Sequence, residues 1–261
     1  MSPVYADHPF PLIQTPAFLL KSQDPNAKVD IFDLCASEMA SVHNMMGRGF
    51  NAIYLQAPHI KQADEKAFCK FMLGWYNLLH IHHSGEEEEF FPDMEKMAGV
   101  AGIMEANVEQ HHAFHDGIEA FKAYVDDVLA GKAKYDGQKV VQMFDSFGPA
   151  LMQHLADEIP SLQSLRQYGE EKFSSLLKRF DQEGEKNIKA LGFGGMVWCF
   201  ANLDVHYEND MWTQWPPAPS VVKFVCRNML WWFHASTVKF GAVDRLGNLK
   251  PLYAAAEEKS A

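Results

Sequence analysis

The chain has 261 residues, of which 48% are hydrophobic and 22% are charged. This composition is typical of a folded globular protein and excludes wholesale disorder and collagen-like or mucin-like architectures. Lys and Arg number 23 against 34 Asp and Glu, giving a formal net charge of -11. A chain this acidic lacks the positive field that gathers phosphate groups, so nucleic acid and anionic membrane surfaces are not expected partners.

No segment has the pattern of a membrane span or a secretory signal. No apolar run approaches the roughly 18–20 residues that cross a bilayer, so no transmembrane segment is expected. The start, Met1-Ser-Pro-Val-Tyr, lacks the basic and apolar regions of a signal peptide. The four cysteines lie far apart with no Cys-x-x-Cys pair, which argues against a disulfide scaffold or a thiolate zinc site. We therefore expect buried free thiols in a reducing compartment, and hence a cytoplasmic protein.

The first third of the chain predicts an arm followed by two helices. Residues 1–29 are rich in proline and show no clean period, so we expect an extended N-terminal arm that packs on the rest. Asp30 is a candidate N-cap for a helix that begins near Ile31. From there apolar residues recur at steps of three and four, predicting an amphipathic helix that ends before Pro58. A second stripe predicts a helix over about residues 64–89, stopped by Pro92.

Two further stripes complete a set of four. One predicts a helix over about residues 100–130, with Gly131 in the position of a C′ glycine. The other covers about residues 138–168 and contains Pro149 and Pro160, so we expect a kink or a break there. No segment has the period of a strand. The sequence therefore predicts an all-α protein, with an up-down-up-down four-helix bundle over residues 30–168.

Residues 169–261 form a predicted C-terminal extension that packs on the bundle. A helical pattern over about residues 170–189 gives way to glycines and to a segment holding five of the six tryptophans. Such aromatic clusters most often serve packing, although here they could also build a substrate pocket. Asp204, His206 and Glu208 allow a second metal site only if they lie on a strand, and a loop explains them equally well.

The predicted bundle carries polar side chains on stripes that should be apolar. Three pairs lie four residues apart, a spacing that stacks two side chains on one helix face. With one histidine on the first helix, the candidates are His43, His82, Glu86, His111, His115, His154 and Glu158. His83 and Glu87 form an alternative pair with the same spacing. We prefer His82 and Glu86 because the apolar stripe of that helix leads to them.

Burying five imidazoles and two carboxylates is costly unless they are paired or bind metal. A single core histidine is more often a hydrogen-bonded structural residue, but that explanation does not suit a set on four helices. Imidazole and carboxylate without thiolate suit iron, manganese or zinc. Seven candidate ligands exceed one tetrahedral zinc site and fit two metals that share carboxylates.

Three segments resemble the signature of a known family. His82-His-Ser-Gly-Glu-Glu-Glu-Glu-Phe-Phe-Pro92 resembles the His-x-x-x-Glu motif of hemerythrin-like (HHE cation-binding) domains. Glu109-Gln-His-His-Ala-Phe-His115 is similar to that family's His-x-x-x-His helix, and His154-Leu-Ala-Asp-Glu158 to its last helix. This resemblance covers about residues 30–168. The remainder is similar, more loosely, to the aromatic extension of uncharacterised fungal members.

The resemblance implies a non-haem di-iron centre with an oxo or hydroxo bridge. One iron would be held by His111, His115 and His154, and the other by His43 and His82. Glu86 and Glu158 would bridge them, leaving an open position on the two-histidine iron for dioxygen. Oxygen-carrying members place Asp five residues after the last histidine, whereas here Glu follows at four. This departure argues against reversible oxygen carriage.

Three classes of function follow from these predictions and stay open. The first is a binding protein that uses the iron pair for O2 or a related small oxidant, in sensing or in iron and oxygen handling. The second is a di-iron oxidase or peroxidase acting on a small organic substrate held by the extension. The third is a metal-poor scaffold whose extension binds a partner.

Overall fold

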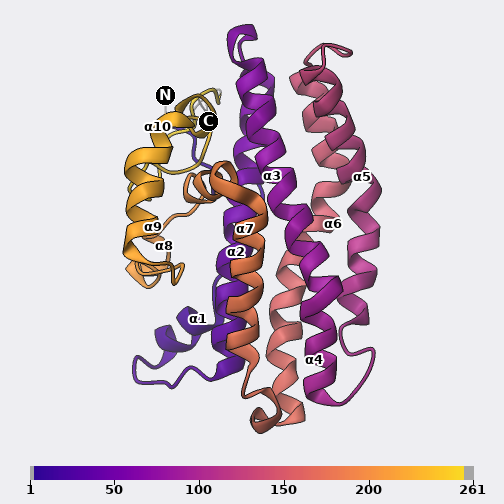
Figure 1. The fold of residues 1–261 in the computed structure, drawn as a ribbon, viewed down its shortest axis with the longest axis vertical. Coiled ribbons are helices and arrows are strands. Elements are labelled where there is room, and N and C mark those ends of the chain that lie inside the picture. Colours follow the sequence, from indigo (N-terminus) through magenta and orange to yellow (C-terminus); the bar gives the residue numbers. More distant parts are fainter. Residues whose placement is uncertain (1–2, 256–261) are drawn as a thin grey trace.

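Four long antiparallel helices form the centre of the computed structural model, which describes residues 3–255 (Figure 1). They are α2 (Ile31–Gln56), α3 (Glu65–Gly85), α5 (Glu105–Leu129) and α6 (Gly137–Ser164). Short connections place successive helices side by side in an up-down-up-down bundle. The predicted all-α class is confirmed.

The ends of these helices follow local chemistry. Asp30 caps α2 as predicted, because its carboxylate accepts from the backbone N–H groups of Phe32 and Asp33. Asp136 caps α6 in the same way. Gly131 follows α5 with a φ of 73°, the left-handed conformation that favours glycine.

The prediction that Pro92 stops the second helix is wrong. After Gly85 the chain passes through a π-helical turn, Glu86–Phe90, into α4 (Phe91–Ala98). Pro92 lies in the first turn of α4, where the missing N–H has no intrahelical partner to lose. Gly99, with a φ of 72°, ends the helix instead.

A kink or a break was predicted at Pro149 and Pro160, and there is no break, because α6 runs through both prolines as one helix. The last turn becomes 3-10 at Leu165–Tyr168. The third predicted helix begins later than expected, at Glu105, because residues 99–104 form turns.

The rest of the chain covers one side of the bundle. α7 (Leu176–Phe200) runs along α2 and α3, and departs from helical geometry at Gly192. Short helices follow, namely α8 (Tyr207–Asp210), α9 (Ser220–Val225), α10 (Trp231–Phe233) and α11 (Ala235–Val238). The N-terminal arm is less extended than predicted, because it contains α1 (Pro16–Gln23), capped by Thr15. Near the two ends of the chain, the Leu252 N–H donates to the Val4 carbonyl over 2.9 Å.

The apolar core is divided into two clusters. One contains Phe50, Trp75, Phe121 and Phe144 and extends into the C-terminal part of α7. The other lies toward the far end of the bundle and contains Phe32, Phe91, Leu162 and Phe173. The candidate histidines lie at the level between the clusters, where apolar packing on each side holds their helices. Within residues 3–255, no helix combines the length and apolarity needed to span a membrane.

Candidate metal centre

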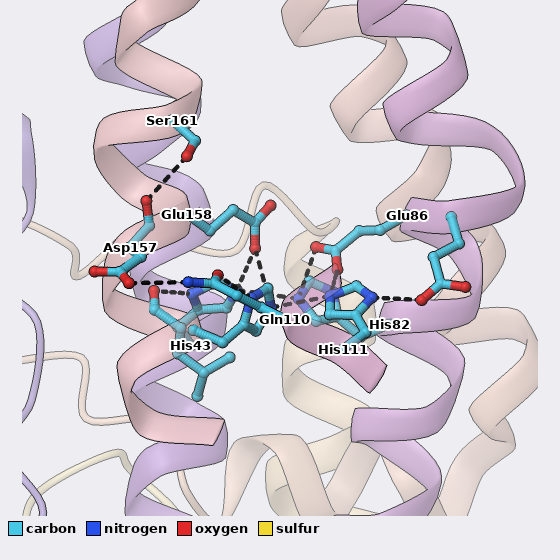
Figure 2. Close-up of polar contacts among 11 residues, drawn as sticks. His43, His82, Glu86, Gln110, His111, Asp157, Glu158 and Ser161 are labelled. Atoms are coloured by element: carbon cyan, nitrogen blue, oxygen red, sulfur yellow. Dashed lines mark hydrogen bonds and ion pairs between the residues drawn. The ribbon is translucent and has the colours of Figure 1, made fainter. Parts of the chain in front are cut away.

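Seven buried side chains from the four bundle helices and the π turn meet at one level of the bundle. Figure 2 shows five of them, His43, His82, Glu86, His111 and Glu158. The seven side chains form two groups. Within each group, one nitrogen or oxygen atom from every residue lies within 4.8 Å of those of the other members. The first group is His43, His82, Glu86 and Glu158, and the second is His83, Glu86, His111 and His154. Glu86 belongs to both, so the two groups are adjacent rather than separate sites.

The imidazole nitrogens come unusually close in pairs. The Nε2 atoms of His43 and His82 are 3.1 Å apart, and those of His111 and His154 are 3.0 Å apart. Donor atoms bound to one metal at about 2.0–2.2 Å are separated by roughly 3.0–3.5 Å. The spacing of these nitrogens therefore fits two rings that share an ion.

Three of the rings are oriented by acceptors on their outer nitrogen. The Nδ1 atom of His43 donates to the Leu155 carbonyl over 2.8 Å. His111 Nδ1 contacts Glu87 over 2.5 Å, and His154 Nδ1 contacts the side-chain oxygen of Gln110 over 3.1 Å. An acceptor at Nδ1 places the proton there and leaves the Nε2 lone pair facing the centre. This arrangement is typical of metal-binding histidines.

The two carboxylates lie between the groups. Glu86 places one oxygen 3.0 Å from His82 Nε2 and the other 3.7 Å from His111 Nε2. Glu158 Oε2 lies 3.4 Å from His43 Nε2 and 3.8 Å from His154 Nε2. Each carboxylate thus faces one histidine from each group, which is the placement a bridging ligand requires.

Neither carboxylate has a hydrogen-bond donor. Glu86 is 2% exposed and Glu158 is 0% exposed, and all four of their oxygens lack a hydrogen-bond partner, as does His83 Nε2. Buried polar atoms without partners are costly and rare in folded proteins. A pair of cations between these side chains would satisfy all of them, so the residues present fit two metal ions.

Burial sets the protonation of the cluster. Desolvation lowers the pKa of His154 to about 2 and lowers the pKa of His43 and His83 well below the ordinary value. These rings are therefore neutral, the form that binds metal. Burial raises the pKa of Glu86 and of Glu158 well above the usual range. Ionising both carboxylates here requires a compensating positive charge.

The structure brings together six of the seven predicted side chains and leaves out His115. His115 is exposed on α5, one turn beyond His111 and outside both groups. Successive steps of four rotate a side chain by about 40° around the helix, and Phe114 and Ile118 take the inward positions instead. His83 fills the corresponding place, with its ring centroid 4.3 Å from that of His111.

Sequence reasoning treated His82 and His83 as alternatives, but both lie in the cluster. Adjacent helical residues point about 100° apart, so a helix between two sites can supply one ligand to each. The partners of the outer ring nitrogens differ from the prediction. Glu87 entered it only as the partner of His83 but contacts His111, and no pattern identified Gln110, whose amide is fixed by a 3.0 Å hydrogen bond to Asp157.

The alternative second site in the extension is not assembled. Asp204 pairs with Arg48, and His206 contacts Asp210. The Glu208 carboxylate accepts from the Thr15 backbone and hydroxyl groups and from the Trp212 indole at 2.6–2.7 Å. Asp204 thus attaches the extension to α2 and Glu208 attaches it to the arm, whereas the His206 contact lies within the extension.

A cavity of about 550 Å³ reaches the cluster from one side. It lies between α7 on one wall and α2 and α3 on the other, and residues 215–219 close part of it. His82 and Glu86 form part of its lining, whereas His43 and Glu158 do not. A smaller pocket of about 120 Å³ lies between α3 and α5, beside His83, His111 and the exposed His115.

Comparison with known proteins agrees with this geometry. Residues 36–159 match the hemerythrin HHE cation-binding domain. Over 250 residues the chain is 32% identical to the dimeric xanthone biosynthesis cluster protein R11 of Cryptosporiopsis sp. (strain 8999), covering 94% of this chain and 90% of the relative. No solved structure matches the chain significantly.

Proposed function

The chain belongs to the hemerythrin HHE cation-binding family, and on that premise we propose that it holds a pair of iron ions at the centre of its bundle. The observation that carries this proposal is Glu86, a buried carboxylate without a hydrogen-bond donor that is common to both ligand groups. Manganese or zinc would fit the same donor types, because imidazole and carboxylate accept all three metals.

The proposed ligands follow the two groups. His43 and His82 hold one ion, and His83, His111 and His154 hold the other. Glu86 and Glu158 lie between them, with an oxo or hydroxo bridge completing the pair. His115 is not among the proposed ligands, because its side chain is exposed and lies outside both groups.

We propose that O2 or a related small oxidant binds on the His82 side. That group has two histidines instead of three, and its ligands His82 and Glu86 face the cavity. An iron pair supplies the electrons that dioxygen accepts. The residues of the chain hold neutral imidazoles in place through their Nδ1 partners and exclude bulk water from the centre through the apolar clusters above and below.

A second candidate is an oxidase or peroxidase that acts on a small organic substrate. The cavity favours this candidate, because a protein that only handles O2 needs no space of about 550 Å³ beside its metal ligands. The relative's name places that protein in a biosynthetic cluster for dimeric xanthones, which is consistent with chemistry on an organic compound.

The proposal extends to the organisation of the chain. Residues 30–168 hold the metals. The described part of the extension, residues 169–255, supplies one wall of the cavity on the His82 side, and the described part of the arm, residues 3–29, fastens the extension. A reducing, cytoplasmic location is supported by four cysteines that are all buried and unpaired.

Metal analysis of three proteins tests the assignment. Protein purified without oxygen and then aerated should contain two irons per chain and develop an oxygen-dependent absorption band. His83→Ala should lower bound iron to one or fewer, whereas His115→Ala, the matched control on the next helix, should keep two. The opposite pattern, or wild-type protein with a single zinc, would overturn the proposal.

A further inference from the structure

The walls of the 550 Å³ cavity suit a flat, unsaturated molecule. Its volume lies within the roughly 300–1,000 Å³ of sites that enclose small organic ligands. Aromatic rings and thioether sulfurs make favourable contacts with aromatic ligands. Such side chains line it from every wall, namely Met39, Met45, Phe90, Phe180, Met196 and Trp215.

Away from the His82 end, the side-chain charges around the cavity disfavour anions. Besides Glu86, four acidic residues line it, Glu38, Asp181, Glu183 and Glu185, against Lys189 as the single lysine or arginine of the lining among residues 3–255. A carboxylate or phosphate ligand would enter against this negative field.

One acidic group also requires a donor. The Oε1 atom of Glu183 is buried against Gly85 without a hydrogen-bond partner, and Glu183 also forms part of the cavity lining. A ligand hydroxyl at that wall would donate to the carboxylate. An ammonium group would cost much more to bury than a hydroxyl, and it would approach the proposed metal ions at the His82 end.

We propose that the cavity binds a neutral, hydroxylated aromatic compound of two or three fused rings, with its hydroxyl donating to Glu183 and its other edge at His82 and Glu86. The inference rests on the proposed function for the role of this compound as substrate. Its binding, however, depends on the cavity walls and can be measured separately from metal content.

Calorimetric titration with 2-naphthol tests the proposal on the full chain, both as purified and after removal of metal with a chelator. We expect 2-naphthol to bind one site, and 2-methylnaphthalene, which lacks the hydroxyl, to bind about tenfold more weakly. 2-Naphthoate and 2-naphthylmethylammonium carry a charge on the same rings and should also bind at least tenfold more weakly. Tighter binding of either charged probe would overturn the proposal.

Two α7 variants locate the site. Ile188 lines the cavity, so Ile188→Trp should fill it and weaken 2-naphthol binding at least tenfold. Ala190 is exposed and outside the lining, so Ala190→Trp is the matched control and should bind as the wild type does. Equal binding by both variants would place the ligand elsewhere and refute the inference.

Glu183→Leu tests the hydroxyl contact. It should bring the affinities for 2-naphthol and 2-methylnaphthalene within about twofold of each other, and an unchanged preference would refute the assigned contact. Two irons per chain without 2-naphthol binding would remove this inference and leave the proposed function. Binding to a folded chain that takes up no metal would remove the proposed function and leave the cavity as an aromatic-compound site.

Discussion

Trp198 at the C-terminal end of α7 fixes the extension to the bundle. The substitution Gly74→Ala, which adds one methyl group beside its ring, tests this role. The Trp198 indole is 2% exposed, lies between Gly49 and Gly74, and donates to the Phe71 carbonyl over 3.0 Å. A Cβ at Gly74 would lie 2.5 Å from Trp198 Cδ1. Ordinary van der Waals contacts between carbon atoms begin about 1 Å beyond that distance. Gly74→Ala therefore forces the Trp198 ring to move.

The magnitude follows from two opposing effects. Overpacking a tight core costs about 1–3 kcal/mol. Replacing a helical glycine by alanine stabilises by about 1 kcal/mol. Gly74→Ala should therefore lower the free energy of unfolding by about 1 kcal/mol. Trp198→Ala should lower it by about 3–5 kcal/mol, the usual cost of removing a buried aromatic side chain.

The combination of the two substitutions provides the decisive measurement. In a Trp198→Ala background the obstacle is gone, so Gly74→Ala should become stabilising by about 1 kcal/mol. Urea unfolding of metal-free protein, followed by circular dichroism, measures all four members of this cycle. Gly184→Ala on α7 is the control and should stabilise in both backgrounds, because a Cβ there meets nothing within 4 Å. A Gly74→Ala effect with the same sign in both backgrounds would refute the reasoning.

Three other predictions concern buried polar groups. Arg48→Ala should destabilise by about 3–5 kcal/mol in urea unfolding, because it leaves the buried Asp204 carboxylate unpaired, and a loss below about 1 kcal/mol would contradict this. All four cysteines are buried, and burial raises the pKa of Cys199 to about 12. Because only an accessible thiolate reacts, a disulfide reagent should label less than one thiol per chain in the native protein but four after unfolding. Burial lowers the pKa of Lys250 to about 8, so the unfolded chain holds a proton that the folded chain has released, and stability should gain about 2 kcal/mol from this group between pH 8 and 10. Lys250→Met should reduce the slope of unfolding free energy against pH, and an unchanged slope would show that this lysine is not buried.

Periodicity predicted the bundle because apolar spacing of three and four fixes which face of each helix is buried. The same reasoning placed His43, His82, Glu86, His111, His154 and Glu158 on inner faces, and the structure brings all six together. That the six side chains lie at the same height along the bundle could also be anticipated, because short connections leave the helices little freedom to slide along their axes. Their role as ligands stays a prediction.

The exchange of His115 for His83 could not be predicted in this way. The predicted stripe of the third helix contains His115, and His83 lies beside the stripe of the second, but which one faces inward depends on how far α3 and α5 rotate against their neighbours. That rotation is set by tertiary packing, here by Phe114 and Ile118 on α5. The π turn was equally hidden, because four consecutive glutamates are typical of a solvated helix face.

That π turn contains one residue more than a regular helical turn would use. In genetic terms, this extra residue corresponds to a single codon in the stretch that encodes Glu86–Glu89. Loss of that codon would let the segment close into a regular helical turn, so Phe90 and Phe91 could keep their places in the second core cluster. The π turn therefore absorbs a difference of one residue between the histidines before it and the phenylalanines after it. Among relatives, a one-residue gap is expected here rather than elsewhere along this helix.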